Sequence, residues 1–206
     1  MTDFAVEFAV LGSATLGESG GAPMAPRIKP AYPGARVCAP AFPVVCSAAD
    51  NLAIHVAVAE APAGSVLVAS VGGEPARGYW GEVLTTGAEA RGIAGLVIDG
   101  GVRDIDALAA HSFPAFSTMI ALRGASKMQP GSVGVVTNVG DVEVHAGDWI
   151  VGDADGVMVV PAAQAEAVLA AGQARAQKEA GFFESLRAGK TTIDLLNLDG
   201  SLIERR

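Results

Sequence analysis

Charged side chains are scarce in this sequence. Asp, Glu, Lys and Arg together make up 17% of its 206 residues, whereas hydrophobic residues make up 50%. This composition argues against a disordered chain and favours a folded globular protein. Basic residues are the scarcer sign, with 14 Lys and Arg against 22 Asp and Glu, so the formal net charge is −8. A nucleic-acid surface needs clustered Lys and Arg, and no such cluster stands out, so we expect no nucleic-acid partner.

Long hydrophobic runs and cysteines are also scarce. No uninterrupted apolar stretch approaches the roughly 20 residues that a membrane helix needs. The first residues, MTDFAVEF, lack the basic start and apolar run of a secretion signal. The two cysteines, Cys38 and Cys46, fit no metal-ligand spacing. We therefore expect a cytoplasmic protein with reduced structural thiols and no membrane association.

The apolar pattern predicts a mixed α/β protein that forms one domain over residues 1–206. Residues 34–46 read as a strand at a sheet edge or bulge, because Pro40 and Pro43 interrupt it. Asp155–Gly156 between two apolar runs predicts a hairpin turn. Further strands are expected within 65–70, 93–99, 113–118, 133–139, 142–153 and 156–161, and helices at 50–61 (with Asp50 as N-cap), 79–91 (closed by Gly92), 105–111 and 162–188.

A guanidinium and a carboxylate follow one of the predicted core strands. The segment GLVI at 95–98 reads as buried, Gly100 and Gly101 indicate a turn, and Arg103 and Asp104 come next. Because open sheets bind ligands just beyond strand ends, the pair can face a cleft. A surface ion pair, or Asp104 capping the next helix, explains the same pattern about as well.

A second candidate lies at the start of the helix predicted at 79–91. The amides at a helix start are free and carry the positive end of the helix dipole, which favours a bound carboxylate or phosphate. Gly81 would let such an anion come close. Glycine-rich helix starts are common, so this signal alone is weak.

Other chemistries have little support. The three histidines share no ligand spacing, and His55 is expected to pack among apolar neighbours rather than act in catalysis. No GxSxG word supports a serine hydrolase. Asp153 and Asp155 fit a hairpin better than a calcium loop. Of the four lysines, only Lys127 is a reasonable Schiff-base candidate.

Together these segments resemble the class II pyruvate aldolases, which share their fold with the regulator of ribonuclease activity A. Glu82, twenty intervening residues and then Arg103–Asp104 match the acidic–x20–Arg–Asp signature of that group. The resemblance extends from about Ala14 to the C-terminal helix. It includes the words DNLAIHVAVAEAPAGSVLV, WGEVLTTGAEARGIAGLVIDGGVRD and AGDWIVGDADGVMVVP.

The resemblance implies a swivelling β/β/α sandwich that assembles as a homotrimer or homohexamer, with active sites between subunits. The helix and tail at about 162–206 would then lie at a subunit interface. It also implies a divalent metal, Mg²⁺ or Mn²⁺, and a small anionic 2-oxo acid as substrate.

The family pattern assigns roles to individual residues. Asp104 would hold the metal, largely through water, and Arg103 would bind the substrate carbonyl or the developing enolate. The substrate-binding positions would be Gly81, the amides of Val83 and Leu84, Asn51 and Lys127. The acidic groups that position water for proton transfer would be Glu18, Glu82 and Glu179, the last across a subunit boundary.

The activity implied is cleavage of a 4-hydroxy-2-oxo acid to pyruvate and a second oxo acid, with oxaloacetate decarboxylation as a side reaction. The chain departs from the pattern at the glycine-rich GESGG, at Gly134 and at Lys190, which bears on the substrate more than on the chemistry. A family enzyme redirected to another 2-oxo acid is one alternative. A non-catalytic binding protein similar to the inhibitor of ribonuclease E is the other.

Overall fold

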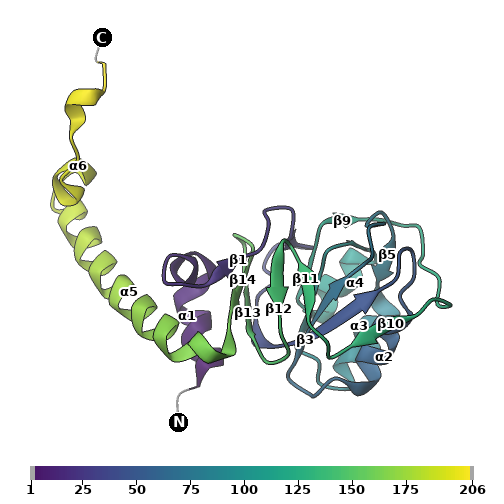
Figure 1. Ribbon diagram of the computed structural model, residues 1–206. Coiled ribbons are helices and arrows are strands. Elements are labelled where there is room, and N and C mark those ends of the chain that lie inside the picture. Colours follow the sequence, from purple (N-terminus) through teal and green to yellow (C-terminus); the bar gives the residue numbers. More distant parts are fainter. Residues whose placement is uncertain (1–2, 205–206) are drawn as a thin grey trace.

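One large mixed sheet, one small parallel sheet and one hairpin contain all the strands of the computed structural model, which describes residues 3–204 (Figure 1). The large sheet has the order β1-β14-β13-β3-β4-β6-β8-β2, and β10 also pairs with β3. Its strands are β1 (Ala22–Pro23), β2 (Lys29–Pro30), β3 (Val37–Cys46), β4 (Val66–Ser70), β6 (Gly95–Ile98), β8 (Ala115–Ser117), β10 (Gly131–Val133), β13 (Trp149–Gly152) and β14 (Val157–Val160).

The remaining elements are arranged around this sheet. The small sheet joins β5 (Gly78–Trp80), β7 (Gly101–Val102) and β9 (Met119–Ile120), and the hairpin joins β11 (Thr137–Val139) to β12 (Val142–Val144). The helices are α1 (Phe4–Gly17), α2 (Leu52–Glu60), α3 (Glu82–Glu89), α4 (Ile105–His111), α5 (Ala165–Arg187) and α6 (Thr192–Leu196), with short 3₁₀ turns at η1 (Ala162–Gln164) and η2 (Gly200–Leu202).

The prediction that residues 34–46 form an edge strand is wrong, because β3 lies inside the sheet. Its first half, through Pro40, pairs antiparallel with β13, and its second half, from Ala41, pairs parallel with β4. Pro40 therefore comes just before the β4 pairing begins. Pro43 lies between the residues that pair with β13 and those that pair with β10. Both prolines stand where a pairing partner changes, which limits the cost of their missing N–H groups.

The parallel strands β4 and β6 are buried on both faces, as the unbroken runs VLVA and GLVI indicate. Alternate residues such as Leu67 and Leu96 pack with α2, α3 and α4. Their neighbours Val66 and Val97 pack on the other face, where the hairpin β11–β12 contributes Val139 and Val144. The period-2 alternation thus builds two hydrophobic clusters from one pair of strands.

The antiparallel end of the sheet has its own cover. Phe8 and Leu16 of α1 and Val168 and Leu169 of α5 pack on β13 and β14. Beyond this contact α5 leaves the sheet, so that it projects from the end opposite α2, α3 and α4 (Figure 1). Its later apolar side chains, including that of Phe183, are exposed. No helix among residues 3–204 has the length and hydropathy needed to cross a bilayer.

Two predicted helix boundaries need correction. The helix expected at 79–91 begins only at Glu82, because Tyr79 and Trp80 belong to β5. The N-cap of α2 is Asn51 rather than Asp50. The Asp50 carboxylate still accepts a hydrogen bond from the amide of Leu52 (2.9 Å), but its other contacts hold a distant loop. The remaining predicted helices and the Asp155–Gly156 hairpin are confirmed.

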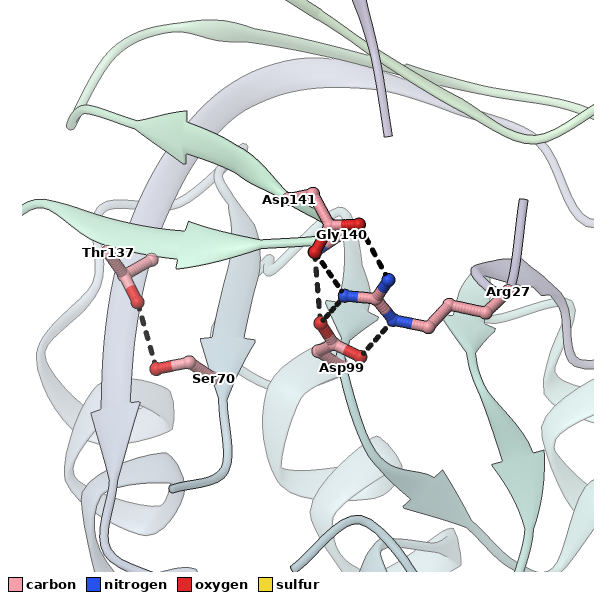
Figure 2. Close-up of polar contacts among 6 residues, drawn as sticks. All are labelled: Arg27, Ser70, Asp99, Thr137, Gly140 and Asp141. Atoms are coloured by element: carbon pink, nitrogen blue, oxygen red, sulfur yellow. Dashed lines mark hydrogen bonds and ion pairs between the residues drawn. The ribbon is translucent and has the colours of Figure 1, made fainter. Parts of the chain in front are cut away.

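Arg27 joins three segments near the end of β6 (Figure 2). Its guanidinium bonds both oxygens of Asp99, which follows β6, and both oxygens of Asp141 in the β11–β12 turn, at 2.7–3.0 Å. Asp99 also accepts from the amide of Gly140 (3.1 Å). The hydrogen bonds from Arg27 lower the pKa of Asp99. This clamp fixes the chain just before it turns into β7.

Candidate functional site

The small sheet aligns the two segments that were predicted as separate sites. The amide of Arg103 donates to the carbonyl of Trp80 (2.9 Å), so the end of β5 and the end of β7 lie side by side. Trp80 is buried, stacks on Phe113 and donates from Nε1 to Thr85 in α3 (2.8 Å). The start of α3 is thereby held next to the Arg103–Asp104 pair.

Asp104 stands at the N-cap position of α4 but does not cap it. Its backbone is left-handed (φ 56°, ψ 41°), and its side chain makes no capping bond. Instead, Oδ2 accepts from the amide of Glu82 (3.0 Å) and lies 3.7 Å from Nε of Arg103. Left-handed backbone is uncommon for a residue other than glycine, although Asp adopts it more readily than most. The capping alternative from the sequence is therefore wrong, whereas the ion-pair alternative is present.

Gly81 permits this contact. A Cβ at this position would lie 2.3 Å from Oδ2 of Asp104 and 3.1 Å from Cγ of Arg103. The backbone of Gly81 is extended (φ −168°), so its need for glycine comes from space and not from backbone strain. Any side chain at this position would push the carboxylate away from the start of α3.

The start of α3 provides amides for an anion. The amide of Glu82 is taken by Asp104, and the amide of Thr85 bonds within the helix to Gly81. Helix geometry leaves the amides of Val83 and Leu84 without an intrahelical acceptor. Both residues line a cavity of about 300 Å³. The weak sequence signal at this helix start thus coincides with a cavity.

Three walls enclose this cavity. One wall contains Arg103 and Asp104, and the second is the start of α3. The third comes from α2 and from the loop after β9, and its polar members are Asn51, His55 and Lys127. A single cavity therefore brings together Asp104, Arg103, Gly81, Val83, Leu84, Asn51 and Lys127, all of which were expected to bind metal or substrate.

Asp50 fixes the third wall. Its buried carboxylate accepts from the hydroxyl of Ser126 (2.5 Å) and from the amides of Met128 (2.6 Å) and Gln129 (3.0 Å). Burial alone would raise the pKa of Asp50, but these bonds and the one from Leu52 lower it to about 2. The carboxylate thus ties the loop that carries Lys127 to the start of the helix that carries Asn51 and His55.

His55 is a site residue that sequence reasoning missed. Its alternation with apolar residues in α2 predicts a packed side chain, yet it is only half-buried and lines the cavity. Burial, followed by the charge of Lys127, lowers the pKa of its imidazole. The available signal was its spacing of four residues from Asn51, which places both on one face of α2.

The three acidic residues expected in proton transfer do not reach the cavity within one chain. The side chain of Glu82 points toward His111, with Oε1 and Nε2 3.9 Å apart. Glu18 and Glu179 both pair with Arg175, where α1 meets α5, and the Nε of Arg175 is 2.9 Å from Glu179. Their roles in proton transfer stay predictions, and for Glu179 the prediction places the acid across a subunit boundary.

Asp104 provides the one carboxylate among the cavity-lining residues, and residues 3–204 contain no group of three or more His, Cys, Asp and Glu arranged to hold an ion. Its contacts within these residues all use Oδ2, which leaves Oδ1 for a ligand. Mg²⁺ keeps several waters and often binds through one or two carboxylates. A largely hydrated ion therefore fits this donor set better than zinc, which needs several protein ligands.

Neither cysteine belongs to the site. Burial raises the pKa of Cys38 to about 11 and that of Cys46 to about 12. Both thiols are free and remain protonated near neutral pH, in keeping with the structural role expected of them.

Comparison with known proteins identifies the family of this chain. Residues 13–159 match the model of the RraA-like family, described as aldolase/RraA. The chain belongs to this family. The matched region contains every cavity residue described above and excludes all of α5.

Individual RraA-like relatives point in two functional directions. A protein of Halalkalibacterium halodurans, named as a candidate 4-hydroxy-4-methyl-2-oxoglutarate aldolase, is 40% identical over 142 residues, which cover 69% of this chain and 68% of that protein. A crystal structure from Pseudomonas syringae pv. tomato, of a protein without an assigned function, has a TM-score of 0.80 at 30% identity and covers 91% of this chain and 90% of that one. The RNA-processing inhibitor RraA of Thermus thermophilis has a TM-score of 0.63 at 27% identity, over 69% of this chain and 86% of that one. The expected fold is confirmed as RraA-like.

Proposed function

We propose that the protein is a divalent-metal-dependent aldolase that cleaves a 4-hydroxy-2-oxo acid to pyruvate and a second oxo acid. One observation carries this proposal. Arg103 and Asp104 lie directly beside the start of α3, and together with its free amides at Val83 and Leu84 they line a cavity sized for a small acid. Carboxylate-binding amides, a guanidinium and a metal-binding carboxylate are the groups that a 2-oxo acid needs at its first two carbons.

The roles of the residues follow from the charges that develop. The amides of Val83 and Leu84 bind the C1 carboxylate, which the positive end of α3 also favours. The guanidinium of Arg103 stabilises the negative charge that forms on the C2 oxygen when the C3–C4 bond breaks. The C4 hydroxyl loses its proton in the same step, and C3 later gains one to give pyruvate. Decarboxylation of oxaloacetate needs the same charge stabilisation at C2, so it is expected as a side activity.

Asp104 would hold Mg²⁺ or Mn²⁺ through Oδ1 and ordered water. The ion, when bound, supplies positive charge that polarises the 2-oxo group. Arg103 lies 3.7 Å from the Asp104 carboxylate, and Gly81 leaves the space in which that carboxylate lies. Removal of the ion is therefore expected to stop turnover without unfolding the chain.

Assembly into a homotrimer or homohexamer is part of the proposal. The exposed apolar side chains of the C-terminal segment, such as Phe183, Leu196 and Leu198, favour an interface there. Glu179 lies on the projecting part of α5, from which it could reach the cavity of a neighbouring subunit (Figure 1). A complete set of acidic groups would then require at least two chains.

An RNA-processing inhibitor is the second candidate, favoured by the structural likeness to the Thermus RraA protein. Such a protein needs a partner surface and has no use for the arrangement of Arg103, Asp104 and Gly81. An enzyme of the same chemistry redirected to another 2-oxo acid is the third, since the departures at Gly134 and Lys190 bear on the substrate.

Pyruvate release distinguishes these candidates. The wild-type protein would be assayed with 4-hydroxy-4-methyl-2-oxoglutarate and with oxaloacetate, through a lactate dehydrogenase couple, with Mg²⁺ and with excess EDTA. The proposal expects release from both substrates and its loss in EDTA. Release from oxaloacetate alone would support the redirected enzyme. No release from either would overturn the enzyme proposal and favour the inhibitor.

A further inference from the structure

The wall of the cavity formed by α2 contains two polar atoms without partners. Nδ2 of Asn51 donates to the carbonyl of Tyr79 (2.8 Å), which fixes the amide and leaves Oδ1 as the free end. Within residues 3–204, Oδ1 of Asn51 and Nε2 of His55 are buried and have no hydrogen-bond partner. Buried polar atoms are nearly always paired, so an unpaired couple in a cavity wall indicates a ligand.

The chemistry of these atoms restricts the ligand. An amide oxygen only accepts hydrogen bonds, so it repels a carboxylate and needs a hydroxyl or N–H donor. The imidazole of His55 is held neutral, because burial and the nearby Lys127 both lower its pKa. A neutral imidazole offers one donor and one acceptor. The ammonium of Lys127, in the same wall, only donates and favours a carboxylate.

A hydroxyl group next to a carboxylate satisfies this set. The hydroxyl hydrogen bonds to Oδ1 of Asn51, its oxygen accepts from the imidazole, and the adjacent carboxylate meets Lys127. A 4-hydroxy-2-oxo diacid carries these two groups at C4 and C5. Because Val83, Leu84 and Arg103 take C1 and C2 at the other walls, C4 and C5 would fall at this one.

We propose that His55, together with Asn51, forms a neutral subsite that binds the C4 hydroxyl of the substrate and so determines selectivity for hydroxylated diacids. This inference rests on the proposed aldolase function. It assigns His55 a specificity role at the hydroxyl-bearing carbon and no part in stabilising charge at C2. Oxaloacetate, which has a carboxylate at C4 but no hydroxyl to donate to Oδ1 of Asn51, would gain less from the subsite.

The test compares two substrates in each variant. His55→Leu is expected to lower kcat/KM for 4-hydroxy-4-methyl-2-oxoglutarate by about tenfold or more, and kcat/KM for oxaloacetate by no more than about twofold. The ratio of the two values is independent of how much of the variant folds. His55→Gln, which keeps polar atoms at this position, should recover part of the ratio. His145→Leu, an exposed histidine outside the cavity, is the matched control and should leave the ratio unchanged.

Asn51→Ala provides a second measurement, since it removes the acceptor without touching the imidazole, and a lowered ratio is expected there too. An unchanged ratio in His55→Leu would overturn the subsite, and so would equal losses on both substrates. A wild-type protein that releases no pyruvate from either substrate would instead overturn the aldolase proposal itself. The two failures are therefore distinguishable.

Discussion

The two ends of the sheet hold different parts of the expected machinery. At the parallel end, the small sheet and the Asp50 network bring seven expected positions around one cavity. At the antiparallel end, Glu18 and Glu179 both form ion pairs with Arg175, and α5 continues into solvent. For the proposed aldolase, one chain would then bind the substrate, whereas proton transfer would use an acid from a second chain.

The largest effect on activity is expected from two variants, one at each end of the sheet, that are assayed alone and then mixed in one oligomer. Glu179→Gln and Asp104→Asn should each lose about a hundredfold or more in kcat as pure proteins, because one removes a proton-transfer group and the other the metal-binding carboxylate. Refolded or exchanged mixtures of the two should regain activity, since some sites would combine an intact Asp104 with an intact Glu179.

Glu184→Gln is the matched control for this experiment, as it alters an exposed acid on the same helix. It should retain activity alone. Mixtures that stay inactive while light scattering shows mixed oligomers would contradict the shared site.

Gly81→Ala tests the cavity end within one chain. The added methyl would meet Oδ2 of Asp104 at 2.3 Å, so the carboxylate must move from the start of α3. A displacement of the carboxylate by about 1 Å is expected to lower kcat/KM by about a hundredfold. The temperature of thermal unfolding should change little. Gly87→Ala in the same helix, where a Cβ meets nothing closer than 3.6 Å, should be active. Equal activity of the two variants would contradict the tight contact.

Asp50→Asn is expected to lower the free energy of unfolding by about 2–4 kcal/mol, because a buried, multiply bonded carboxylate is lost. The pKa of Asp50 is lowered to about 2 in the folded protein, so its contribution is complete above about pH 4 and is lost as pH falls toward 2. Urea unfolding of both proteins between pH 3 and 7 measures this. A stability difference that grows with falling pH would have the wrong sign.

The smallest effect concerns the clamp at the end of β6. Arg27→Gln should cost no more than about 1 kcal/mol, because the guanidinium is 43% exposed and solvent screens its pairs. The cost should shrink further in 1 M salt. A loss independent of salt would show that Arg27 contributes mainly through packing.

The sequence was sufficient for the core strands and helices of the parallel end and for most of the cavity, but it did not predict the small sheet of β5, β7 and β9. Continuous apolar runs predicted β4 and β6, and the glycines around Arg103 indicated a strand end open to a ligand. The sequence was misleading where strands pair with partners that are distant in the chain. Pro40 and Pro43 argued for an edge, but only the partner change along β3 explains why an inner strand tolerates them.

His55 and Asp50 were misjudged for a related reason. Local pattern placed His55 on an apolar helix and Asp50 at a cap, whereas the fold brings both next to the loop at 124–129, about 70 or more positions away in the chain. The positions of Glu18 and Glu179 illustrate the same limit between chains, because no pattern within one sequence specifies which neighbour completes a site.

Oxaloacetate decarboxylation by wild-type, Asp104→Asn and Asp106→Asn proteins, titrated with Mg²⁺, tests the central claim most directly. Asp106 is an exposed acid two positions away in α4 and serves as the matched control. We expect Mg²⁺-dependent pyruvate release above the enzyme-free rate by the wild type and by Asp106→Asn, and release no faster than the enzyme-free rate by Asp104→Asn at every Mg²⁺ concentration. Full activity in a folded Asp104→Asn protein would contradict it.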